Sequence, residues 1–74
     1  MEITIYNGTK RETYKATDAE VISDYLVIYG EQNQYEEFME AALTYGGAFF
    51  WESQLLWVDL PIRFVEKIDN RTNK

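Results

Sequence analysis

The fold of this chain depends most on residues 17–30, which read TDAEVISDYLVIYG. Thr17 followed by Glu20 matches a capping box, in which the two side chains satisfy free backbone N–H groups at a helix start. Apolar residues then recur at helical spacing, and Gly30 is a typical helix stop. These apolar positions are Ala19, Ile22, Leu26 and Tyr29, flanked by Val21, Tyr25 and Ile28. The stretch therefore predicts a helix from about Asp18 to Tyr29.

The residues before this helix predict a β-hairpin. Residues 2–6, EITIY, alternate in polarity and are rich in β-branched side chains, as strands are. Asn7-Gly8 supplies the left-handed backbone that a hairpin turn needs, and residues 11–16 return as the second strand. A loop of two residues and a loop of four residues place the same side chains on the same face of the hairpin. We therefore expect one face to carry Ile3, Ile5, Glu12, Tyr14 and Ala16.

The residues after Gly30 predict a second helix, which begins near Asn33 and ends at Gly46-Gly47. An apolar stripe at helical spacing predicts the buried side: Tyr35, Phe38, Met39, Ala42 and Leu43. The opposite side carries three carboxylates, which we expect to be exposed: Glu36, Glu37 and Glu40.

The last third of the chain predicts strands. Residues 48–51 and 54–59 are aromatic and aliphatic runs of strand length, and they predict a hairpin that turns at Glu52-Ser53. Two interpretations remain open beyond Pro61. The second strand could continue with Pro61 at a sheet edge, or a short helix could start there and bury Ile62, Val65 and Ile68. We expect residues 69–74 to form a frayed tail.

The element order is thus β-β-α-α-β-β with an uncertain last element. It predicts one small α+β domain over residues 1–74, with an antiparallel sheet of about four strands and two helices packed on one face. A chain of 74 residues without Cys has one core and no disulfide to stabilise it. The twelve aromatic residues (two Trp, six Tyr and four Phe) are the main source of buried apolar area.

The charge of the chain is strongly acidic and unevenly distributed. Seven basic and thirteen acidic residues give a formal net charge of −6, and no Lys or Arg occurs from residue 16 to residue 62. The carboxylates of that segment are Asp18, Glu20, Asp24, Glu31, Glu36, Glu37, Glu40, Glu52 and Asp59. A one-signed field of this kind has two interpretations, solubility and mimicry of nucleic-acid phosphate.

Composition argues against several function classes. The chain has no His and no Cys, so the common nucleophilic dyads and triads are excluded and we expect no enzyme. No loop has the ligand spacing of a calcium site and no Gly-rich phosphate loop occurs, so we expect no metal and no cofactor. Direct binding of nucleic acid is disfavoured by the negative charge. No export signal or membrane span is recognisable, which predicts a cytoplasmic protein.

In size, acidity, aromatic content and lack of catalytic residues, the chain resembles the small inhibitors that phages and mobile elements make against host nucleases, such as anti-CRISPR and anti-restriction proteins. No sequence motif carries this resemblance. It implies a protein that docks on a basic, nucleic-acid-binding surface of a host protein. The residues we expect to make that contact are Asp24, Glu31, Tyr35, Glu36, Glu37, Glu40 and Trp51.

The alternative is a homo-oligomeric structural or adaptor module, with a homodimer as its simplest form. The predicted C-terminal hairpin is apolar on both faces, with Phe49 and Trp51 on one and Ala48 and Phe50 on the other. One face packs on the helices, and the other needs a cover. Salt separates the two hypotheses, because an electrostatic contact weakens as salt rises and an apolar one does not.

Overall fold

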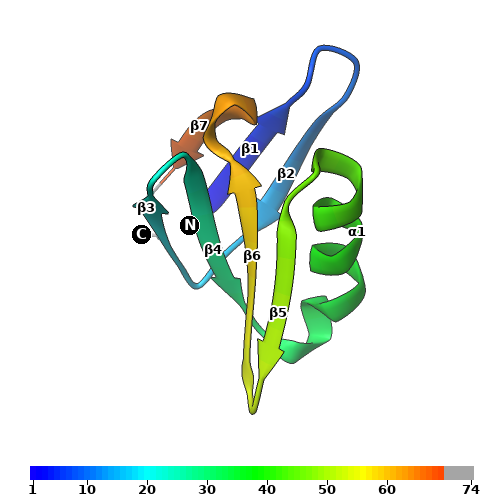
Figure 1. The fold of residues 1–74 in the computed structure, drawn as a ribbon, viewed down its shortest axis with the longest axis vertical. Coiled ribbons are helices and arrows are strands. Elements are labelled where there is room, and N and C mark those ends of the chain that lie inside the picture. Colours follow the sequence, from blue (N-terminus) through cyan, green and yellow to red (C-terminus); the bar gives the residue numbers. More distant parts are fainter. Residues whose placement is uncertain (70–74) are drawn as a thin grey trace.

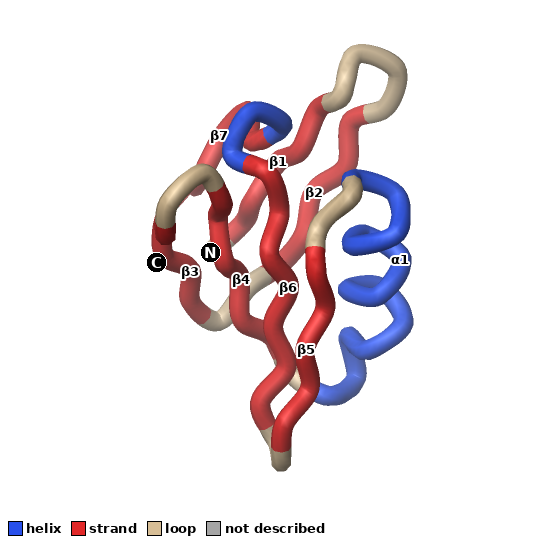
Figure 2. Tube along the Cα trace, in the orientation of Figure 1, coloured by secondary structure: helices blue, strands red, loops and turns tan. Residues whose placement is uncertain are grey.

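The computed structural model describes residues 1–69 as seven strands, one α-helix and two short 3₁₀ turns (Figures 1 and 2). The strands are β1 (Glu2–Tyr6), β2 (Arg11–Lys15), β3 (Asp18–Ile22), β4 (Tyr25–Gly30), β5 (Ala48–Glu52), β6 (Leu55–Pro61) and β7 (Val65–Asp69). The helix α1 spans Tyr35–Tyr45, and the 3₁₀ turns are η1 (Gln32–Gln34) and η2 (Ile62–Phe64). They form a three-stranded sheet of order β2-β1-β7 and a four-stranded sheet of order β3-β4-β6-β5, both antiparallel.

The α+β class was predicted correctly, but the two-helix, single-sheet architecture was wrong. The three-stranded sheet lies across one face of the four-stranded sheet, and α1 packs on the same side against β6 and β5 (Figure 1). The side chains between these layers form the core: Ile3, Ile5, Tyr14, Ala16, Leu26, Ile28, Phe38, Ala41, Ala42, Tyr45, Leu56, Val58 and Leu60. No described element covers the opposite face of the four-stranded sheet (Figure 2).

The predicted helix over residues 18–29 is the main error. These residues form the β3–β4 hairpin instead, with a turn at Ser23-Asp24 in which Ser23 has a φ of 57°. Thr17 does not cap a helix, because its Oγ1 donates to the carbonyl of Tyr29 at 3.1 Å. The reason is tertiary: every residue of β4 pairs with β6, and the alternation of β4 then buries Leu26 and Ile28 in the core.

The first hairpin was predicted correctly. Ile3 pairs with Tyr14 and Ile5 with Glu12, which places the predicted residues on one face, and the loop has four residues. The Asn7 side chain closes this loop by accepting hydrogen bonds from the backbone N–H groups of Thr9 and Lys10 at 3.0 and 2.9 Å.

The second predicted helix exists, but it is rotated about its axis relative to the predicted stripe. Its buried residues are Phe38, Ala41, Ala42 and Tyr45. Met39 and Leu43, which the stripe placed inside, are 37% and 79% exposed. The start also differs, since the N-cap is Gln34 rather than Asn33, whereas the stop at Gly46 is as predicted, with a φ of 73°.

The C-terminal hairpin is confirmed, with its turn at residues 53–54, one residue later than predicted. Each of the two interpretations of the chain beyond Pro61 describes only part of what the structure has there. Strand β6 ends at Pro61, η2 follows, and β7 then joins the other sheet as the partner of β1. Of the predicted tail, Asp69 is the last residue of β7, and residues 70–74 lie outside the described residues.

Candidate functional site

The structure brings most of the predicted contact residues together around α1. Glu36, Glu37 and Glu40 are all exposed on this helix, with Glu36 and Glu37 in its first turn. Tyr35 and Trp51 meet edge to face, with ring centroids 5.0 Å apart, although they come from α1 and β5. Trp51 is 53% exposed. We call these five residues the acidic helix surface. It combines carboxylates with an accessible aromatic pair.

Two of the predicted residues have other positions. Glu31 lies just before α1, where its backbone N–H donates to the side chain of Gln34 at 3.0 Å. Asp24 lies in the turn between β3 and β4, and its backbone carbonyl accepts from Ile62 at 2.9 Å. Strand β3 is the edge strand farthest from β5 and α1 (Figure 1). Asp24 therefore does not belong to the acidic helix surface.

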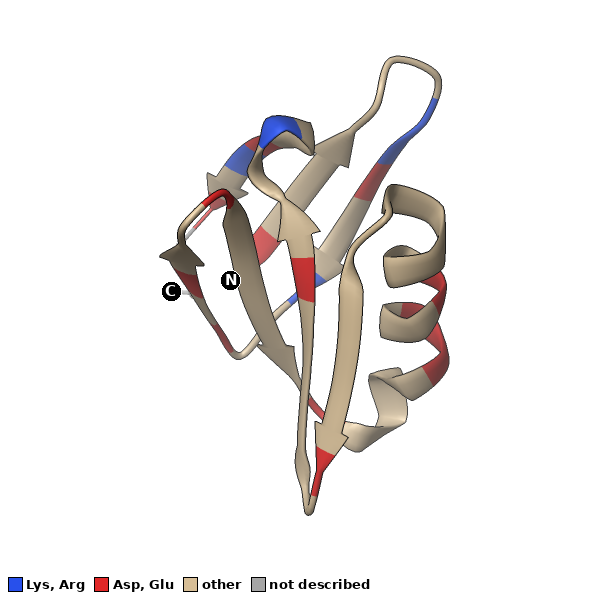
Figure 3. Ribbon diagram, viewed as in Figure 1, with Lys and Arg blue, Asp and Glu red and all other residues tan. Residues whose placement is uncertain are grey.

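The basic residues of the first hairpin form their ion pairs outside the acidic segment, although Glu40 adds to the effect of Glu12 in raising the pKa of Lys10. Within residues 1–69 the ion pairs join Lys10 to Glu12 at 2.9 Å and Arg11 to Glu66 at 2.8 Å. The hydrogen bond from Arg11 lowers the pKa of the Glu66 carboxyl. Figure 3 shows that the basic positions lie outside both the four-stranded sheet and α1. Within residues 1–69 no ion pair reaches the carboxylates of that part.

The uncovered face of the four-stranded sheet is a second candidate, and the sequence predicted only part of it. We call it the outer face. Its cross-strand register places Tyr29, Trp57 and Phe50 side by side on β4, β6 and β5. The rings of Phe50 and Trp57 are nearly parallel, with 23° between their planes and centroids 5.3 Å apart, and the centroid of Tyr29 lies 6.2 Å from that of Trp57 on the next strand. The apolar position of Phe50 was predicted from the sequence, but the aromatic row was not, because Tyr29 was predicted to lie on a helix rather than beside Trp57.

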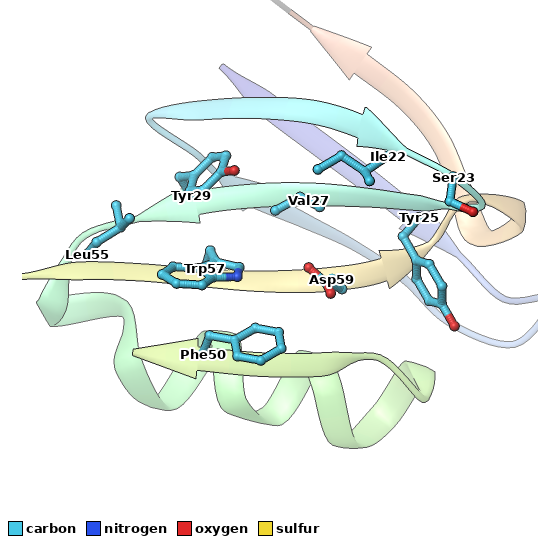
Figure 4. Close-up of a pocket in the computed structure, with 9 residues that line it drawn as sticks. All are labelled: Ile22, Ser23, Tyr25, Val27, Tyr29, Phe50, Leu55, Trp57 and Asp59. Carbon is cyan, nitrogen blue, oxygen red and sulfur yellow. The ribbon is translucent and has the colours of Figure 1, made fainter. Parts of the chain in front are cut away.

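The outer face is hollowed between its side chains. A shallow depression of about 480 Å³ is lined by Ile22, Ser23, Tyr25, Val27, Tyr29, Phe50, Leu55, Trp57 and Asp59 (Figure 4). Asp59 lies in the middle, with Trp57 on one side and Tyr25 on the other (Figure 4). In the row beside the aromatic one, Asp59 and Glu20 flank Val27. The Tyr29 hydroxyl donates to Glu20 at 2.6 Å, which raises the pKa of Tyr29.

The carboxylate of Asp59 has no ion-pair or hydrogen-bond partner within residues 1–69. The ion pairs of that part of the chain involve other acids, Glu12 and Glu66. Its partial burial raises the pKa of its carboxyl above the ordinary value of 3.8, because desolvation disfavours the charged form. Asp59 keeps its ordinary pKa in the unfolded chain. At a pH between the two pKa values, Asp59 is therefore more often protonated in the folded protein than in the unfolded chain. Stability is therefore lost as pH rises through that window.

We expect Asp59→Asn to raise the melting temperature at neutral pH, since the amide removes a desolvated charge. This gain should disappear at about pH 3, where both states carry a neutral side chain. Thermal melts of both proteins at the two pH values measure the difference. Glu52→Gln is the matched control, because it removes one charge from an exposed position on the same face. An equal gain from Glu52→Gln would show that only net charge matters.

In the part of the chain that the structure describes, no three carboxylates gather closely enough to hold a metal ion. None of the described helices has both the length and the apolar character that crossing a membrane requires.

Comparisons of the chain with protein-family models, with curated proteins and with solved structures found no match.

Proposed function

We propose that this chain is a non-catalytic inhibitor that occupies a basic, nucleic-acid-binding surface of a host protein, such as a nuclease. It would act as the anti-defence proteins of phages and mobile elements do. The observation that carries the proposal is the acidic helix surface, where Glu36, Glu37 and Glu40 are all exposed. None of the ion pairs found within residues 1–69 involves them.

Electrostatics supports this function over simple solubility. Glu36 and Glu40 stand one helical turn apart, where like charges destabilise a helix by a few tenths of a kcal/mol. With Glu37 they form a compact negative patch rather than a scattered one. A patch of one sign speeds association with a surface of opposite sign, and it disfavours partners of like charge.

The aromatic pair gives the surface an anchor. Trp and Tyr are among the side chains that most often dominate the binding energy of protein interfaces. Trp51 is half exposed beside Tyr35, and the neighbouring Met39 and Leu43 add apolar area on α1. The surface therefore combines apolar contact with charge, as a protein interface does.

Reversing the charge of the helix surface should abolish partner binding and leave the fold intact. The variant is Glu36→Lys, Glu37→Lys and Glu40→Lys together, which changes the net charge from −6 to 0 (three changes of +2). Attraction to a basic surface then becomes repulsion, which costs several kcal/mol. The loss of the acids at the helix start costs up to about 1 kcal/mol each, so circular dichroism must accompany the assay.

The assay immobilises each protein, passes a bacterial lysate over it, and identifies the retained proteins by mass spectrometry at low and high salt. The expected catch is a basic nucleic-acid-binding protein that duplex DNA displaces. The control variant is Glu2→Lys, Asp24→Lys and Glu66→Lys, which makes the same change in net charge at exposed positions away from both α1 and the outer face. Full capture by the folded helix variant, or equal loss in the control, would contradict the proposal.

The second candidate function is a homo-oligomeric module that associates through the β5–β6 hairpin. Phe50 and Leu55 favour it, since they are 43% and 45% exposed on the outer face. Analytical ultracentrifugation separates the two functions: an oligomer that persists at high salt supports the module, and a monomer supports the inhibitor.

A further inference from the structure

The outer face has the composition of a site for a cationic side chain. Its aromatic row carries Phe50 and Trp57, and the faces of aromatic rings carry partial negative charge. Carboxylates accompany the rings at the centre and along the edges: Asp18, Glu20, Glu52 and Asp59. No Lys or Arg occurs on any of the four strands. A positive group is attracted to such a surface in two ways, by cation–π interaction with the rings and by charge attraction to the carboxylates.

Trp57 and Asp59 set the chemistry of that group. They are two residues apart on β6, so their side chains point to the same face roughly 6–7 Å apart. A planar guanidinium fits this arrangement, because its flat face stacks on an indole while its N–H groups donate to a carboxylate. The ammonium of Lys is a strongly hydrated point charge, and it fits such a stacked position less well.

We propose that the outer face binds an arginine side chain of a partner protein, whose guanidinium stacks on Trp57 and pairs with Asp59. The occupied site provides the counter-ion that Asp59 lacks within residues 1–69. The depression of about 480 Å³ is open enough for a side chain to enter from the solvent with its backbone outside.

A second copy of this chain suits the face less well. Packing two outer faces together would bring Asp59 and Glu20 of one copy against the acidic residues of the other, and each chain carries a net charge of −6. Like charges brought together across an interface cost several kcal/mol. Charge complementarity therefore favours a basic partner over self-association.

The site is distinct from the acidic helix surface. Side chains alternate between the two faces of a sheet, so Phe50 lies on the outer face and Trp51 on the side that α1 covers. The arginine site goes beyond the proposed inhibition, and either proposal can fail while the other stands.

Trp fluorescence can observe this site alone. In a Trp51→Phe background, Trp57 is the only Trp of the chain. The probe is a short blocked peptide with a single arginine between glycines. Its matched control carries citrulline, which has nearly the same shape as arginine but no charge. We expect the arginine peptide to change the Trp57 emission at low salt, and the citrulline and lysine peptides to bind about tenfold more weakly.

Asp59→Asn in the same background should weaken the arginine peptide about tenfold, the factor that corresponds to one lost charged partner. Because this substitution is expected to stabilise the fold, unfolding cannot account for the loss. Glu2→Gln removes one charge from an exposed position on the other sheet and should change the affinity by less than about twofold.

Three binding results would overturn the proposal: no response to the arginine peptide, equal binding of the citrulline peptide, or equal losses in Asp59→Asn and Glu2→Gln. The last would indicate attraction to net charge without a site. A dimer that buries Trp57 and excludes the peptide would also overturn it, in favour of a second copy.

Discussion

Phe38→Ala is expected to unfold the protein at room temperature. Phe38 is completely buried in the core and its ring lies against Gly30 at the end of β4. Replacing a buried Phe with Ala costs about 3–5 kcal/mol, through lost apolar burial and the cavity that remains. A core in a chain of this size supplies only about 3–5 kcal/mol in total. Circular dichroism of the variant should therefore show no cooperative melting transition above 25 °C.

Leu43→Ala is the matched control on the same helix. Leu43 is 79% exposed, so its truncation should change the free energy of unfolding by no more than about 0.5 kcal/mol. The sequence stripe placed both residues in the core, and the structure separates them. Similar costs for the two variants would indicate that α1 is rotated toward the stripe predicted from the sequence.

The rotation of α1 could not be predicted because its apolar residues cover too wide an arc. Seven of its eleven residues are apolar or aromatic: Tyr35, Phe38, Met39, Ala41, Ala42, Leu43 and Tyr45. The predicted stripe included Phe38 and Ala42 but left out Ala41 and Tyr45. The structure buries all four, and the small size of Ala41 and Ala42 lets the helix approach β5 and β6 closely.

The segment over residues 17–30 satisfies two periodicities at once. Its apolar residues match a helix stripe, and Leu26 and Ile28 also match the alternation of a strand. The β-branched residues and the Ser23-Asp24 pair were the local signals for a hairpin. Pairing with β6 decides between the two, and that partner is distant in sequence. Local propensity and spacing could not supply this information.

Separation along the sequence also explains which parts of the candidate sites could be predicted. The carboxylates of α1 follow directly from helical spacing, and they are exposed as expected. The meeting of Tyr35 with Trp51 requires the packing of α1 on β5. The aromatic row needs the register of three strands, and an incorrect assignment for Tyr29 was enough to hide it. The exposure of residues within one element followed from the sequence, and contacts between elements did not.

Gly47→Ala is the second substitution with a large expected effect. A Cβ at this position would lie 1.8 Å from the backbone oxygen of Asp59, far inside van der Waals contact. A backbone atom in a central strand cannot move aside as a flexible side chain can, so β5 and β6 must separate where Ala48 pairs with Asp59. Overpacking of this kind costs about 3 kcal/mol, most of the stability expected for this chain.

The adjacent glycine separates this effect from the general cost of replacing a glycine. Gly46 has a φ of 73° and open space around its Cβ position, so Gly46→Ala meets backbone strain but no clash. That strain costs roughly 1–2 kcal/mol. Urea unfolding of both variants should therefore show a larger loss for Gly47→Ala, with reduced cooperativity if β5 detaches. A smaller loss at Gly47 than at Gly46 would mean that β5 does not approach β6 this closely. In that case the register that aligns Phe50 with Trp57 on the outer face would also be wrong.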